Sequence, residues 1–88
     1  MREVQEGMIS CQLAYYPMGD AQYLQQIDTV IALIEASSVW YEIREGSSIL
    51  KGAPSDIFAL LQKIVEIKKG NAFVINATIS NVCGCEIE

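Results

Sequence analysis

The sequence predicts an α+β fold in which two helices cover one face of a four-stranded antiparallel sheet. Alternating apolar and polar residues, the pattern of half-buried strands, occur in four segments: 8–16, 39–45, 48–52 and 72–82. Two other segments, 20–37 and 54–69, repeat apolar residues every three or four positions, which predicts amphipathic helices. The resulting order, βαββαβ, is that of the ferredoxin-like sandwich. In this sandwich the helices leave the second face of the sheet uncovered.

The first strand and the first helix are separated by a short break, Pro17-Met18-Gly19. Asp20 is the expected helix cap, because its carboxylate can accept hydrogen bonds from N–H groups of the first turn. The apolar stripe of this helix consists of Leu24, Ile27, Val30, Ile31 and Ile34. The stripe ends at Ser37-Ser38 and is expected to pack on the sheet.

The second half of the chain begins with a hairpin, since Gly46-Ser47 supports a tight reversal between two strands. Pro54 fits the first turn of the second helix, with Ser55 or Ala53 as its cap. The stripe of this helix consists of Ile57, Leu60, Leu61 and Ile64, with Phe58 and Val65 alongside. Lys68-Lys69-Gly70-Asn71 indicates where the helix stops.

The bulk properties favour a small cytoplasmic domain. The 88 residues predict one domain, residues 1–88, whose core is small enough that assembly into a homo-oligomer is expected. The net charge of −5 and the scattered cations argue against nucleic acid as a partner. No apolar run approaches the roughly 18 residues of a membrane span, and residues 1–7 lack the apolar stretch of a signal peptide. Three cysteines, an odd number, are typical of a reducing compartment.

The residues that usually carry out catalysis are scarce. Histidine, the commonest general base, is absent, and no glycine-rich phosphate loop or nucleophile elbow occurs. Cys83-Gly84-Cys85 supplies two thiols, but a closed zinc site needs four ligands, so a reduced thiol pair without metal is expected. Cys11 alternates with apolar neighbours and is expected in the core. The sequence therefore predicts no enzyme, no cofactor and no metal site.

A polar face on the first strand is the main candidate for ligand binding. Gln12, Ala14 and Tyr16 point to the same side of the strand, opposite to Leu13 and its neighbours. Gln12 offers hydrogen-bond donors and an acceptor, Ala14 leaves space, and Tyr16 supplies a flat aromatic ring. This combination suits a planar heterocycle that carries an amino group. The same pattern also fits a one-sided sheet whose polar side faces solvent or another subunit.

Five segments follow one another in an order typical of a known family: Gln12–Gly19, Tyr23, Tyr41-Glu42, Ser48–Gly52 and Asp56–Phe58. Over roughly residues 8 to 80 the chain resembles the YkoF-like thiamine/hydroxymethylpyrimidine-binding family, including its small single-domain members. The resemblance implies a ferredoxin-like domain that associates through its sheets into dimers or tetramers. It also implies that the domain binds the pyrimidine moiety of thiamine without converting it.

The resemblance also suggests roles for individual residues. Gln12, Tyr16 and Ser48 stand where the family has its polar strand residues, although the family usually has threonine at the position of Ser48. Tyr16 would stack on the aminopyrimidine, while Gln12 and Ser48 would bond to its ring nitrogens and amino group. Asn76 and Thr78 would add donors and acceptors if the fourth strand lies beside the first. The alternative is an oligomeric interaction or regulatory module that binds no vitamin.

Overall fold

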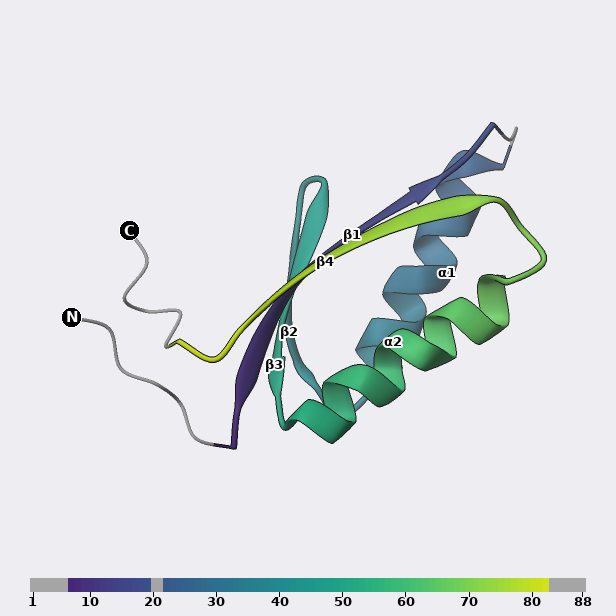
Figure 1. Cartoon of the computed structure of the whole chain (residues 1–88). Helices are drawn as coiled ribbons and strands as arrows, with labels where there is room; N and C mark the ends of the chain where they lie inside the picture. The colour runs from purple at the N-terminus through teal and green to yellow at the C-terminus, as the bar shows by residue number, and fades with distance from the viewer. Residues whose placement is uncertain (1–6, 20–21, 83–88) are drawn as a thin grey trace.

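Four antiparallel strands form one sheet in the order β2-β3-β1-β4, and both helices lie against the same face of it (Figure 1). The computed structural model describes residues 7–19 and 22–82. Its elements are β1 (Ile9–Pro17), α1 (Tyr23–Ala36), β2 (Trp40–Arg44), β3 (Ser47–Gly52), α2 (Pro54–Lys68) and β4 (Phe73–Ser80). The predicted α+β fold and element order are therefore confirmed. The Cys83-Gly84-Cys85 motif lies outside the described residues.

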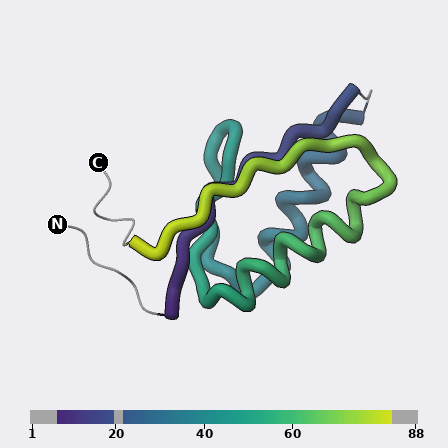
Figure 2. Tube along the Cα trace, viewed as in Figure 1, coloured from purple at the N-terminus to yellow at the C-terminus, as the bar shows by residue number. Residues whose placement is uncertain are grey.

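The strand β1 is the centre of the sheet and sets the register of its neighbours. It pairs with β4 along almost its whole length, from Ser10 opposite Ser80 to Pro17 opposite Phe73. The two chain paths run side by side in Figure 2. Its pairing with β3 is shorter and stops where Leu13 lies opposite Ser48. None of the helices in the described part of the chain is long and apolar enough to cross a membrane.

The start of α1 differs from the sequence prediction. The helix begins at Tyr23 with Gln22 as its N-cap residue, whereas the predicted cap, Asp20, lies outside the described residues. The residues of α1 that are buried on the sheet are Gln26, Val30 and Ile34, spaced four apart. Leu24 precedes Gln26 by two positions, or about 200° around the helix. Leu24 is consequently 72% exposed, and its place in the predicted buried stripe is wrong.

The core lies between the sheet and the two helices. Nine buried apolar residues form it: Cys11, Leu13, Val30, Ile34, Val39, Leu50, Ile57, Leu60 and Ile64. Ile57, Leu60 and Ile64 of the predicted α2 stripe are buried, which confirms their place in the core. The helix starts with Ala53 as N-cap and has a proline in its first turn. Phe58 and Val65, which flank that stripe, are exposed. Cys11 is 0% exposed, which confirms its predicted place in the core.

Burial raises the pKa of the Cys11 thiol above its ordinary value of about 9.0. The stability due to the neutral buried thiol is fully present below that unfolded-state value and is lost as pH rises through the raised native value. As pH rises from the unfolded-state value of about 9.0 toward the raised native value, we expect the free energy of unfolding to fall less in Cys11→Val than in the parent chain. Urea unfolding at a series of pH values measures this difference. If the free energy of unfolding falls equally with pH in the two proteins, the raised pKa of the buried Cys11 thiol is contradicted.

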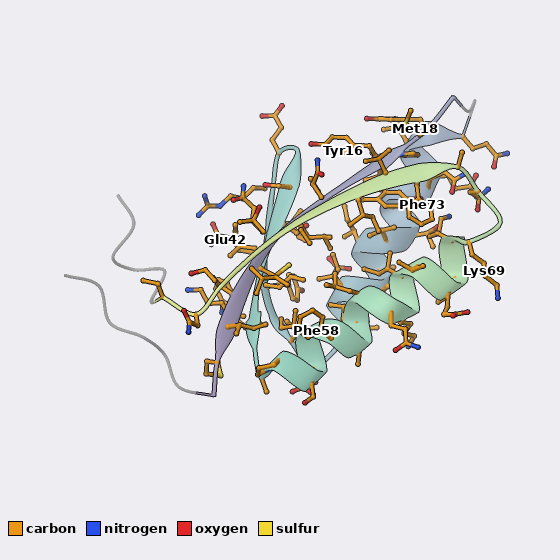
Figure 3. All side chains as sticks on the ribbon, viewed as in Figure 1. Tyr16, Met18, Glu42, Phe58, Lys69 and Phe73 are labelled. Carbon is orange, nitrogen blue, oxygen red and sulfur yellow. The ribbon has the colours of Figure 1, made fainter. Side chains whose placement is uncertain are left out.

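Neither helix of the described part of the chain lies on the second face of the sheet, as predicted (Figure 1). The even-numbered residues of β1 and β2 point to this face, among them Gln12 and Tyr16 on β1 and Trp40 and Glu42 on β2. Tyr16 and Glu42 project from this side in Figure 3, whereas Phe73 points toward the helices. Trp40 and Tyr41 therefore occupy opposite faces of β2, as the alternation predicted. On this open face the Lys51 ammonium lies 4.8 Å from the Trp40 ring centroid, a cation–π contact.

Candidate functional site

A cleft of about 200 Å³ lies on the helix-covered side of the sheet, between α1 and the tip of the β2–β3 hairpin. It exists because β3 begins only at Ser47, so that β1 beyond Leu13 has no neighbour on that side. Its walls are mostly apolar and come from three parts of the fold. The lining residues are Leu13, Tyr15, Tyr16, Tyr23, Ile27, Val30, Ile31, Ile34, Ile43, Arg44, Gly46, Ser47 and Ser48.

Two of the polar groups in this lining are buried, the Ser48 side chain and the Tyr15 hydroxyl. Ser48 is only 8% exposed and lies opposite Leu13 on one side and Ile43 on the other. The Tyr15 hydroxyl is buried and has no hydrogen-bond partner among the described residues. Burial raises the pKa of Tyr15, so its hydroxyl stays protonated and able to donate. A buried hydroxyl without a partner is costly, and a bound polar group would relieve that cost.

The mouth of the cleft is formed by the hairpin tip and the first turn of α1. Gly46 has a φ of 84°, a conformation that glycine adopts readily in a tight turn. Arg44 stands beside this turn, and its Nε lies 2.9 Å from a carboxylate oxygen of Glu42. Both side chains are largely exposed, so this ion pair contributes at most about 1 kcal/mol. Because Arg44 shares its parity with Glu42, this ion pair holds the guanidinium on the open face of the sheet, although Arg44 is one of the residues that line the cleft.

The five predicted site residues fall on two faces of the sheet. Gln12, Tyr16, Asn76 and Thr78 lie on the open face, with Gln12 opposite Thr78 in the β1–β4 register. Ser48 lies on the helix-covered face. Within one chain the sheet therefore lies between Ser48 and Gln12, and the structure does not bring these two side chains together. Tyr16 belongs to both places, because it also reaches the rim of the cleft at the uncovered edge of β1.

Sequence reasoning missed Tyr15, Tyr23 and Arg44 as lining residues. A signal for Tyr15 was present, since it shares its parity with Leu13 and so had to point toward the helices. The same rule applies to Ser48, which alternates with Ile49 and shares its face with the core residue Leu50.

In residues 7–19 and 22–82 no three metal-binding side chains gather closely enough to hold an ion.

The fold and the cleft define a class of protein: a small ferredoxin-like domain with one open sheet face and a cleft between α1 and the β2–β3 hairpin. The chain belongs to the YKOF-related family, whose model matches residues 8–86. A search among curated proteins finds no match.

Solved structures show the same fold. A protein from Streptococcus pneumoniae superposes with a TM-score of 0.81 at 19% identity, covering 91% of this chain and 92% of that one. A Thermotoga maritima protein, assigned provisionally to thiamine biosynthesis or salvage, gives 0.75 at 17% identity, with 83% and 82% covered. A domain of unknown function from Bacillus cereus gives 0.73 at 15% identity, with 88% and 76% covered. Identities this low establish the fold alone.

Proposed function

We propose that this protein is a non-enzymatic, cytoplasmic binder of thiamine or of its hydroxymethylpyrimidine moiety, and that the pyrimidine ring occupies the cleft beside α1. The observation that carries the proposal is the cleft itself, which is concave and mostly apolar and is lined by Ser48 and Tyr15. A few polar groups in an apolar cavity are what orients a small planar ligand. Membership of the YKOF-related family and the likeness to the Thermotoga maritima protein support the same choice of ligand.

The size of the cleft restricts how much of thiamine it encloses. Its volume of about 200 Å³ is smaller than the roughly 300–1,000 Å³ typical of sites for drug-sized ligands. One six-membered ring therefore fits inside, and the thiazolium half would extend through the mouth. The thiazolium half would then make few contacts with the walls of the cleft. We therefore expect hydroxymethylpyrimidine to bind at least as tightly as thiamine.

Calorimetric titration of the whole chain tests the proposal. Hydroxymethylpyrimidine and thiamine should both give saturable heats, whereas the isolated hydroxyethylthiazole half should give none. The thiazole alcohol is the matched control, because it is a small heterocycle of the same vitamin but lacks the aminopyrimidine. Absence of binding by both pyrimidine compounds would overturn the proposed function.

Tyr16→Ala and Gln12→Leu together separate the two places in which a ring could bind, because Tyr16 belongs to both and Gln12 only to the open face. Loss of the Tyr16 aromatic surface at the rim is expected to weaken hydroxymethylpyrimidine binding by about 1–3 kcal/mol, the value found for base stacking. Gln12→Leu changes the open face of the same strand but does not touch the cleft, and affinity should be unchanged. Calorimetry on both folded variants gives the answer. If Gln12→Leu weakens binding instead, the ring lies on the open face with Gln12, Asn76 and Thr78.

The open face favours a second role, association with another copy of the chain. It exposes Trp40 and Val74 in addition to Tyr16, and a sheet face of this kind is commonly covered by a partner. We expect a sedimentation mass above the 9.7 kDa of one chain at micromolar concentration. Ile49→Asp, which adds a charge near the middle of this face, should restore the mass of a single chain. A parent protein that stays at 9.7 kDa over a wide concentration range would exclude this role.

A further inference from the structure

The strand β1 is longer than its partner β3, and this leaves part of its main chain without a neighbour. The pairs between β1 and β3 end with Leu13 opposite Ser48, whereas the pairs between β1 and β4 continue to Pro17 opposite Phe73. If the β1–β3 register continued, Gly46 would lie opposite Tyr15. Gly46 instead forms the turn, with a φ of 84°. In the described part of the chain, no strand therefore pairs with β1 at residues 14–17 on the side of the hairpin, and we call this segment the uncovered edge.

The hydrogen-bond pattern shows which main-chain groups face this uncovered side. The Met18 N–H donates to the Ala72 carbonyl at 3.0 Å, just beyond the last β1–β4 pair. Successive residues of a strand direct their N–H and C=O groups to opposite sides. Even-numbered residues of β1 therefore bond toward β4, and odd-numbered residues face β3 or the space where β3 has ended.

Tyr15 and Pro17 are the odd-numbered residues of the uncovered edge. Pro17 has no N–H, and proline is tolerated in a strand where the missing N–H faces no partner. A proline at position 17 thus agrees with the deduction from Met18 that the main-chain groups of odd-numbered residues face away from β4. Tyr15 is left as the residue of this edge that offers a donor and an acceptor side by side. Its side chain lines the cleft, and its hydroxyl lacks a partner among the described residues.

An aminopyrimidine has a matching edge, because a ring nitrogen that accepts lies next to an amino group that donates. We propose that the Tyr15 main-chain N–H and C=O bind this edge with two hydrogen bonds, in the way that a residue of a neighbouring strand would. The ligand then takes the place opposite Tyr15 that Gly46 leaves empty. This inference rests on the proposed function and names the part of the ligand that is recognised: an amino group beside a ring nitrogen.

The pairing also explains how a site with few polar side chains could be selective. Main-chain groups are fixed by the β1–β4 ladder and lose little freedom on binding. A pyrimidine without its amino group would keep one of the two bonds and leave the Tyr15 carbonyl unpaired in the cleft. An unpaired buried acceptor costs about 1–3 kcal/mol, so affinity for that analogue should be about tenfold to a hundredfold lower.

Amide hydrogen exchange, followed by NMR on the whole isotope-labelled chain, tests the proposal directly. Without ligand the Tyr15 amide should exchange faster than the Tyr16 amide, which bonds toward β4. Saturating hydroxymethylpyrimidine should slow exchange at Tyr15 by about tenfold or more and leave Tyr16 nearly unchanged. A bound state, established by calorimetry, in which Tyr15 exchange is unaltered overturns the main-chain pairing but leaves the proposed function intact. Absence of any calorimetric binding overturns both.

A pair of variants provides a second test. Tyr15→Ala and Tyr15→Pro both remove the ring, but only proline also removes the N–H. Because this N–H has no strand partner, Tyr15→Pro should fold, and its affinity for hydroxymethylpyrimidine should be about threefold to tenfold below that of Tyr15→Ala. Ala14→Pro is the control for direction and should be markedly less stable, because its N–H bonds toward β4. Equal affinities of the folded alanine and proline variants of Tyr15 would overturn the proposal.

Discussion

Replacing Leu50 by alanine is expected to lower the free energy of unfolding by about 2–5 kcal/mol. Leu50 is fully buried in the middle of β3 and lies between Cys11 on β1 and Tyr41 on β2. Removing its side chain leaves a cavity that neighbours fixed in two strand ladders cannot fill. A domain of this size has only a modest margin of stability, so the midpoint of urea unfolding should shift strongly.

Leu24→Ala is the matched control for this measurement. The change of side chain is the same, but Leu24 is exposed on the first turn of α1, and we expect an effect within about 0.5 kcal/mol. Similar losses in the two variants would mean that Leu24 packs in the core after all. That result would contradict the orientation of α1 described above.

Ser48→Val is expected to weaken hydroxymethylpyrimidine binding by about 1–3 kcal/mol, since a polar ligand atom would then be buried without a partner. Ser48 is the one side chain of the cleft that is both buried and polar on β3. The hydroxyl is lost, while the apolar atoms that replace it keep the wall of the cleft intact. Calorimetry against the parent chain measures the difference.

Ser48→Thr provides the control, because threonine and valine have nearly the same shape and differ in the hydroxyl. Threonine should retain most of the affinity. If both variants bind as tightly as the parent, Ser48 only supports the strand, and the ligand meets its polar partners elsewhere. If both lose binding, added bulk at this position blocks the cleft and the hydroxyl has no separate effect.

Much of the fold was predictable because each element carries its own periodic pattern. The alternation of Cys11 and Leu13 with polar residues indicated a strand with one buried face, and the structure buries both. Gly46 indicated the hairpin turn, and its positive φ explains why glycine stands there. Pro54 indicated the start of α2, which begins at that residue. These signals are local, so they need no knowledge of what the segment packs against.

The site was only partly predictable because it depends on the relative lengths of strands. The sequence of β3 does not indicate that its pairing with β1 stops at Ser48, and without that information the cleft cannot be predicted. Gln26 is a second example, since a buried glutamine in place of Leu24 contradicts a hydropathy stripe. Its Oε1 is buried with no partner in the described part of the chain. Tertiary packing decided both cases.

The central position of β1 has a consequence for how such a chain can change over time. Its even-numbered residues, such as Gln12, meet whatever lies outside the sheet, and its odd-numbered residues, such as Tyr15, face the interior and the cleft. A substitution at an even-numbered position of β1 changes little on the helix-covered side of the sheet, and a substitution at an odd-numbered position changes little on the open face. On the proposed function, odd-numbered residues of β1 such as Tyr15 would determine the ligand and even-numbered residues such as Gln12 would determine the partner, so that each set could change separately.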